Sequence, residues 1–178
     1  MTLSRTGADT GPRAMSALGI GQAAGGVSPD AQIMTADGII PAAFLSPGDR
    51  IITRRGIRPL RAILRRNLRP GAPCVLVSKD ALGGKPERDA ILLPGQRVLI
   101  RDWRAKAMWN REAAAPQLRQ LVDGQYIRWV EDGPEAVLQL HFGQPEIIYA
   151  DGLELASADP LPKRTTASGS ADVTDDRA

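Results

Sequence analysis

Few side chains in this sequence can do acid–base, nucleophilic or metal chemistry. The 178 residues include one cysteine, Cys74, and one histidine, His141. A single cysteine excludes an internal disulfide and a thiolate metal cage, and a single histidine excludes any site that needs two imidazole ligands. We therefore expect neither a metal nor another cofactor. Cys74 opens the apolar run CVLVS and is typical of a buried thiol, whereas His141 is typical of a half-exposed strand residue.

The charge of the chain is concentrated in a strip of arginines. Residues 50–69 hold eight arginines and no acidic residue, while the whole chain carries a net charge of only +3. A basic strip of this kind can bind nucleic acid or another polyanion. The candidate polyanion-binding residues are Arg54, Arg55, Arg58, Arg61, Arg65 and Arg66. The arginines alternate with isoleucines and leucines, however, and this pattern is more typical of a solvent-facing strand edge, where charge prevents aggregation.

Two stretches carry a longer pattern. They read IMTADGIIPAAFLSPGDRIITRRG over residues 33–56 and ILLPGQRVLI over residues 91–100. Through their Asp-Gly, Pro-Gly-Asp and Gln-Arg-Val-Leu segments they resemble the Hint domain of hedgehog proteins and inteins. The resemblance is strongest to a bacterial branch in which this domain stands almost alone. It spans residues 27–157 and implies the fold of a self-processing domain.

The same resemblance implies a catalytic set that this chain lacks. A cysteine opens the family's domain about nine residues before the threonine that matches Thr35, and Gly26 stands there. Family histidines are matched by Gln96, Gln139 and Pro145. Self-processing needs a thiol or hydroxyl that attacks the preceding carbonyl and an imidazole that protonates the leaving nitrogen. Glycine and glutamine supply neither group, so we expect an inactive domain that serves as a binding or scaffold module for an unidentified protein partner.

One hydroxyl keeps an enzymatic alternative open. Ser28 lies two residues beyond Gly26 and could attack a carbonyl, which would make the chain a weakly active self-processing domain. It precedes Pro29, and the pattern offers it no base. The acidic residue and the serine that family members carry further along are replaced by Leu155 and Ala156. Binding module, weak processing at Ser28 and polyanion binding thus remain as three alternatives.

The elements that must position these residues are short strands. Apolar runs separated by Asp-Gly, Pro-Gly-Asp and Gly-Gly turns predict a compact all-β domain. The expected strands cover residues 31–35, 50–53, 74–78, 98–101, 126–130, 136–142 and 146–150. One short helix is expected over residues 111–122, where Ala113, Leu118 and Leu121 share a face and Asp123-Gly124 ends it.

The two ends differ from the middle in composition. Residues 1–26 and 159–178 are small and polar without periodicity, so we expect flexible tails around a Hint-like domain over residues 27–158. The length suits one domain. The sequence contains neither a run of about 18 apolar residues nor an apolar signal region. We therefore expect a cytoplasmic protein without a membrane span, and the oligomeric state stays open.

Overall fold

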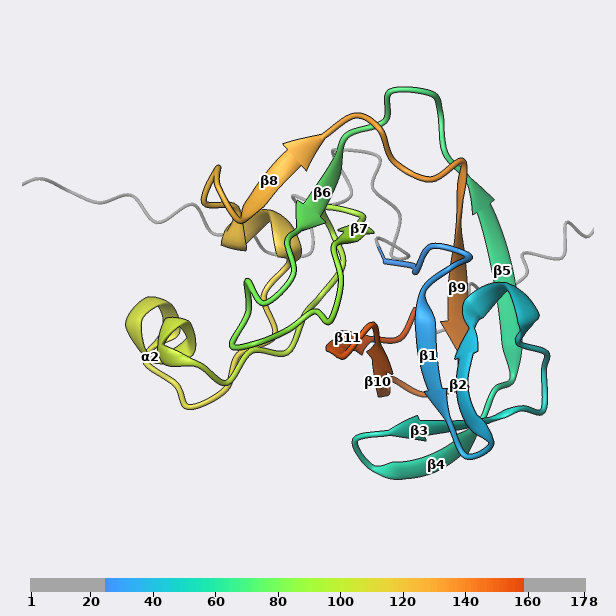
Figure 1. Cartoon of the computed structure of the whole chain (residues 1–178). Helices are drawn as coiled ribbons and strands as arrows, with labels where there is room; N and C mark the ends of the chain where they lie inside the picture. Colours follow the sequence, from blue (N-terminus) through green and yellow to red (C-terminus); the bar gives the residue numbers. More distant parts are fainter. Residues whose placement is uncertain (1–24, 159–178) are drawn as a thin grey trace, which may run out of the picture.

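Short strands joined by tight turns make up most of the structure, a computed structural model that describes residues 25–158 (Figure 1). The elements in chain order are β1 (Gln32–Thr35), β2 (Gly38–Pro41), the 3-10 helix η1 (Ala42–Phe44), β3 (Arg50–Thr53), β4 (Gly56–Pro59), β5 (Ala62–Asn67), β6 (Cys74–Val77), β7 (Ala90–Leu92), α2 (Trp103–Trp109), the 3-10 helix η2 (Leu118–Leu121), β8 (Ile127–Val130), β9 (Ala136–His141), β10 (Ile147–Ala150) and β11 (Leu153–Ala156). The predicted all-β class with one short helix is confirmed. The predictions for residues 1–24 and 159–178 lie outside the described residues.

The strands form three antiparallel sheets. The largest has the order β11-β10-β1-β3-β4, with β2 beside β1. In the second sheet β6 lies between β7 and β8, and the third consists of β5 and β9. Figure 1 shows β6, β7, β8 and α2 on one side of the molecule and β1–β5 with β9 on the other. The chain that enters at residue 27 runs beside β9, because Val27 and Leu138 form an isolated bridge.

Two hairpins of the largest sheet share the same four-residue turn. The hydroxyl of Thr35 lies 2.7 Å from the carbonyl oxygen of Gly38, and the hydroxyl of Thr53 lies 2.7 Å from that of Gly56. Both glycines have positive φ, 116° and 102°, which a side chain would strain. The spacing Thr-x-x-Gly therefore marks β1–β2 and β3–β4 in the sequence, although only the first strand of each hairpin was expected.

One apolar core joins the three sheets. Ile33 and Ile51 from the largest sheet, Val75 from β6 and Leu138 from β9 belong to the same cluster of buried side chains. Each is at most 8% exposed, and such burial contributes about 1.5–3 kcal/mol per side chain. Isoleucine, leucine, valine and alanine dominate this core, as the low aromatic content predicts.

The predicted position of the helix is wrong. The helix, α2, begins after Asp102, whose side chain accepts a hydrogen bond of 2.9 Å from the N–H of Arg104. It ends at Asn110, which takes a left-handed conformation with φ 52°. An aspartate before the helix and an asparagine after it are typical boundary residues. These signals were present in the sequence but were outweighed by the apolar periodicity further along.

The segment expected to be helical is not an α-helix. Ala114 forms a bridge with Ile100, and Gln117 forms one with Arg97. Residues 118–121 form η2, a short 3-10 helix that carries the buried Leu118 and Leu121. The backbone of Ala114 pairs with that of Ile100 and therefore closes no helical turn. The expected strand at 98–101 is present only as isolated bridges, of Val98 with Leu155 and of Ile100 with Ala114.

Candidate functional site

The peptide bond between Gly25 and Gly26 lies between two glutamine side chains. The carbonyl oxygen of Gly25 accepts a hydrogen bond of 3.0 Å from Nε2 of Gln139. The N–H of Gly26 donates a hydrogen bond of 2.9 Å to Oε1 of Gln96. Both glutamines are buried. We call these four residues the peptide clamp, and three of them, Gly26, Gln96 and Gln139, were selected from the sequence.

Strand β9 and the turn after β7 position the two glutamines. Gln139 projects from β9, and the entering chain is aligned beside this strand by two backbone bonds between Val27 and Leu138, of 2.9 and 2.8 Å. Gln96 follows a Pro-Gly turn, and its N–H donates to the carbonyl of Leu93 at 3.0 Å. The clamp is therefore built by residues that lie far apart in the sequence.

Gln96 makes two further bonds that tie the clamp to the end of β11. Its Nε2 donates to the carbonyl oxygen of Arg97 at 2.9 Å and to that of Ala156 at 3.0 Å. The oxygen of the amide thus faces a donor and its nitrogen faces two acceptors, which fixes the orientation of the group. One side chain consequently joins the chain entering at Gly26 to the chain leaving at Ala156.

In the observed packing, a Cβ at residue 25 or at residue 26 would lie too close to its neighbours. A Cβ on Gly25 would lie 2.5 Å from Oε1 of Gln96. A Cβ on Gly26 would lie 2.9 Å from Cγ2 of Val137 and 3.3 Å from the carbonyl oxygen of Leu138. Gly26 also has φ 148°, where any side chain is strained. The space that a nucleophile at residue 26 would need is occupied by β9.

The geometry favours binding of the peptide over cleavage. Donation from Gln139 polarises the Gly25 carbonyl, as an oxyanion hole does. The oxygen of Gln96, however, accepts a hydrogen bond from the Gly26 N–H, and the side chain cannot deliver a proton to this nitrogen, because an amide does not titrate near neutral pH. Gly26 has no side chain and therefore offers no attacking atom. The clamp therefore holds a peptide bond without the groups that would break it.

Ser28 lies beyond the clamp and is already engaged. Its hydroxyl donates to the carboxylate of Asp30, two residues further along. The carbonyl of Val27, the one that Ser28 could attack, accepts a hydrogen bond of 2.8 Å from Leu138. Asp30 in turn lies 3.4 Å from a guanidinium nitrogen of Arg88. These hydrogen bonds are typical of a turn that is capped by a side chain. Weak self-processing at Ser28 stays a prediction.

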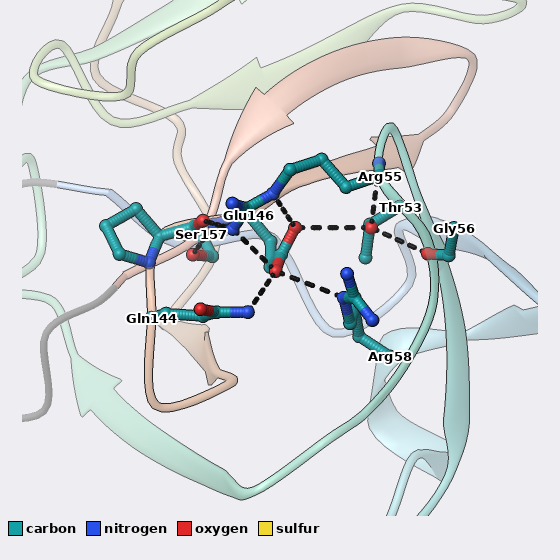
Figure 2. A network of polar contacts seen from close by, with 8 residues as sticks. Thr53, Arg55, Gly56, Arg58, Gln144, Glu146 and Ser157 are labelled. Atoms are coloured by element: carbon teal, nitrogen blue, oxygen red, sulfur yellow. Dashed lines mark hydrogen bonds and ion pairs between the residues drawn. The ribbon is translucent and has the colours of Figure 1, made fainter.

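Pro145 does not join the clamp but borders a buried carboxylate, Glu146 (Figure 2). The side chain of Glu146 is fully buried. Its Oε1 lies 2.8 Å from a guanidinium nitrogen of Arg55 and 3.5 Å from Nε of Arg58. Arg55 also donates to the Pro145 carbonyl oxygen at 2.8 Å, and Thr53 Oγ1 lies 3.3 Å from Glu146 Oε2. The network fastens the β3–β4 turn to the start of β10.

Two opposing effects set the pKa of Glu146. Burial raises the pKa because it disfavours the charged form. Hydrogen bonding and charge attraction from Arg55, together with hydrogen bonds from Thr53 and Gln144, lower it by more. The net result is a pKa below the ordinary value for a glutamate, so Glu146 is a carboxylate at neutral pH and a structural group of the hairpin.

The arginine strip is divided by the fold. On the first hairpin, Arg50 pairs with Asp37 at 2.8 Å and Arg54 with Glu154 at 3.4 Å, while Arg55 and Arg58 face Glu146. These four arginines have partners within the domain. The other four arginines of the strip, on and around β5, are exposed. They are Arg61, Arg65, Arg66 and Arg69. Polyanion binding by the whole strip stays a prediction, and four of its eight arginines already face carboxylates of the domain.

His141 and Cys74 differ in how they compare with expectation. The predicted half-exposure of His141 is wrong: its relative exposure is 0%, because β9 is buried along its whole length between β5 and residue 27. Cys74 is buried as expected, and burial raises the pKa of its thiol. Within residues 25–158, no three histidine, cysteine or acidic side chains cluster as metal ligands would. In the same part of the chain, no helix is long and apolar enough to cross a membrane.

The sequence match that decides the family covers nearly all of the described region. The family model described as "Hint domain" matches residues 26–161. The chain belongs to the Hint domain family. Its match begins at Gly26, at the N–H side of the clamped peptide bond. Among curated proteins, none matches the chain.

Solved structures show the same fold at low sequence identity. The intein TvoVMA is 13% identical, with a TM-score of 0.53, over 75% of this chain and 97% of that chain. A bacterial intein-like domain from Clostridium thermocellum is 12% identical, with a TM-score of 0.50, over 75% of this chain and 96% of that one. The described region is therefore a Hint fold in which nearly all of each comparison chain has a counterpart.

Two contributors to the site of this Hint domain were not selected from the sequence. Gly25 supplies the clamped carbonyl, and the consecutive glycines at 25 and 26 were a signal for it, since each position must lack a Cβ. Glu146 had no such signal, because its partners come from a hairpin that lies about 90 residues earlier in the chain.

Proposed function

We propose that this chain is a Hint domain that binds its own entering peptide without cleaving it and serves as a scaffold that holds its two flanking segments together. The observation that carries the proposal is the clamp. The Gly25–Gly26 peptide bond is hydrogen-bonded at its carbonyl by Gln139 and at its N–H by Gln96. Neither glutamine can move a proton, and glycine cannot attack a carbonyl.

The bonds of Gln96 support the scaffold part of the proposal. Its amide reaches both the entering chain at Gly26 and the leaving chain at Ala156. Segments attached to the two ends of the domain would therefore be held next to each other. Loss of general acid catalysis typically slows a reaction by about 10² to 10⁴, and loss of the nucleophile removes the covalent route.

Intact mass tests the inactive state. The purified full-length chain is incubated for days at neutral pH, with and without a thiol or hydroxylamine, which open thioesters and esters, and is followed by mass spectrometry. We expect the full-length mass to persist in every condition. A fragment that begins between Gly26 and Ser28, and disappears in Ser28→Ala, would replace this proposal with weak processing at Ser28.

Amide hydrogen exchange tests the clamp itself. We expect the Gly26 N–H to be protected in the native protein, because it donates to a buried acceptor. Gln96→Ala should raise its exchange rate by at least about tenfold, while Gln125→Ala, which removes an exposed glutamine, should leave it unchanged. An unprotected Gly26 N–H in the native chain would show that the peptide is not held.

A further inference from the structure

Strand β5 has a partner on only one side. It pairs with β9 over six residue pairs, from Ala62 opposite His141 to Asn67 opposite Ala136. In the described part of the chain no other strand pairs with β5. Figure 1 shows β5 at the outer side of the molecule with β9 on its inner side. β5 is the joint longest strand of the structure, so its outer edge is a long unpaired edge.

The unpaired edge presents regularly spaced backbone groups. The N–H of Leu68 donates a hydrogen bond of 2.8 Å to the carbonyl oxygen of Glu135, the residue before β9. This bond continues the register of the β5–β9 pairs. Hydrogen-bonded pairs recur at every second residue of an antiparallel ladder. Leu64 and Arg66 therefore direct their N–H and C=O groups to β9, and Ile63 and Arg65 direct theirs outward. An extended chain laid along this edge can bond to them as an additional strand.

Three arginines that form no ion pair within residues 25–158 lie along the same edge. Arg61, Arg65 and Arg69 are exposed, and none of them takes part in the ion pairs of the described residues. Residues 50–69 contain no acidic side chain that could neutralise them locally. The edge thus combines free backbone donors and acceptors with a positive potential.

The positive charge of these arginines restricts which strands can pair with the edge. A second copy of β5 would bring arginines against arginines across the new ladder, and like charges opposite each other are destabilising. A chain with acidic side chains would meet complementary charge and still form the backbone bonds. We propose that the outer edge of β5 binds an extended acidic segment of a partner protein by strand addition. This surface is separate from the clamp, which contacts the opposite edge and one face of β9.

Fluorescence anisotropy with the full-length chain tests the charge requirement. The probe is a labelled nine-residue peptide of alternating glutamate and valine at low ionic strength. We expect saturable binding that weakens as salt is added. The variant Arg61→Ser/Arg65→Ser/Arg69→Ser should bind at least about tenfold more weakly, since three exposed ion pairs of up to about 1 kcal/mol each are lost.

A control of equal charge separates the edge from net charge. Lys79→Ser/Lys106→Ser/Arg111→Ser removes three exposed cations elsewhere and should bind within about twofold of the native chain. Circular dichroism verifies that both triple variants are folded. Unchanged binding by the β5 variant, or equal weakening by the control, would overturn the proposal.

Backbone-methylated peptides test strand addition and do not depend on any variant folding. Two versions of the probe carry N-methyl groups on alternate amides, one version for each alternation. The version methylated on the amides that face β5 should lose binding, because it lacks the donors of the new ladder. Equal binding of both versions and the parent peptide, or stronger binding of duplex DNA or heparin through the same arginines, would assign the edge to non-specific anion binding and contradict strand addition.

Discussion

At the scale of single residues, Gly26 is more than a position without a nucleophile. Its φ of 148° and the closeness of Val137 mean that β9 occupies the space that a side chain would fill. A cysteine at this position would therefore need a change in the backbone or in Val137.

We expect Gly26→Ala to lower the free energy of unfolding by about 2–5 kcal/mol. The conformational strain accounts for about 1–2 kcal/mol and the contact with Val137 for about 1–3 kcal/mol. Gly38→Ala is the matched control, because Gly38 has φ 116° and no atom within 4 Å of its ideal Cβ. It should lose only the conformational part. Urea unfolding of both variants measures the difference.

A double-mutant cycle isolates the steric part. If Val137 blocks a side chain at residue 26, Gly26→Ala should lower the free energy of unfolding less in the Val137→Ala background than in the native chain. The difference should be about 1 kcal/mol or more. Additive effects of the two substitutions, with equal losses for Gly26→Ala and Gly38→Ala, would show that the space beside Gly26 is not filled.

At the scale of elements, Glu146 fastens one hairpin to another strand. Thr53 and Arg55 come from the β3–β4 turn and Glu146 from the start of β10 (Figure 2). The ion pair is buried at the carboxylate and about half exposed at Arg55, so it contributes less than a fully buried pair. We expect Glu146→Gln to lower the free energy of unfolding by about 1–2 kcal/mol at pH 7, measured by urea unfolding.

The lowered pKa of Glu146 sets the pH dependence of this contribution. Because the pKa in the folded state lies below that in the unfolded state, the stabilisation is fully present above about pH 4.3. It is lost as the pH falls through the folded pKa. The difference in the free energy of unfolding between the native chain and Glu146→Gln should therefore shrink on acidification below about pH 4.3. Glu87→Gln, at an exposed pair with Lys85, should show no comparable change. Parallel pH curves for the native chain and Glu146→Gln would contradict this role.

At the scale of the whole molecule, Gln96 connects the beginning and the end of the domain. Its amide bonds to Gly26 near the start and to Ala156 at the end of β11. A proton-transferring residue in this place would have to leave some of these groups unsatisfied, because an imidazole has only two polar nitrogens. The hydrogen bonds of Gln96 should therefore contribute directly to the stability of the domain.

We expect Gln96→Ala to lower the free energy of unfolding by about 2–4 kcal/mol, because it leaves the buried N–H of Gly26 and the carbonyl of Ala156 without the hydrogen bonds of Gln96, at about 1–3 kcal/mol for each group that water does not reach. Gln125→Ala should stay within about 0.5 kcal/mol of the native chain. Chemical unfolding measures both. A loss below 1 kcal/mol for Gln96→Ala would mean that the two ends are held together by other contacts.

The sequence by itself determined the class of the fold and the residue types available for chemistry. Turn residues such as Asp37-Gly38 act locally, since their backbone preferences need no distant partner, and so the strand that precedes each such turn could be predicted. The residue types at positions 26 and 96 likewise excluded a nucleophile and a proton donor without any coordinates, because composition alone sets what a side chain can donate or attack.

The tertiary structure decided where those residues act and what they contact. Residues 113–117 are not helical because Ile100 pairs with Ala114, a contact between separate segments that outweighs the helical periodicity. Full burial of His141 follows from neighbours on both sides of β9, and half of the arginines in the strip face carboxylates from other parts of the domain. Hydrogen bonds and ion pairs across long sequence separations depend on the complete fold, so the clamp and the Glu146 network became visible only in three dimensions.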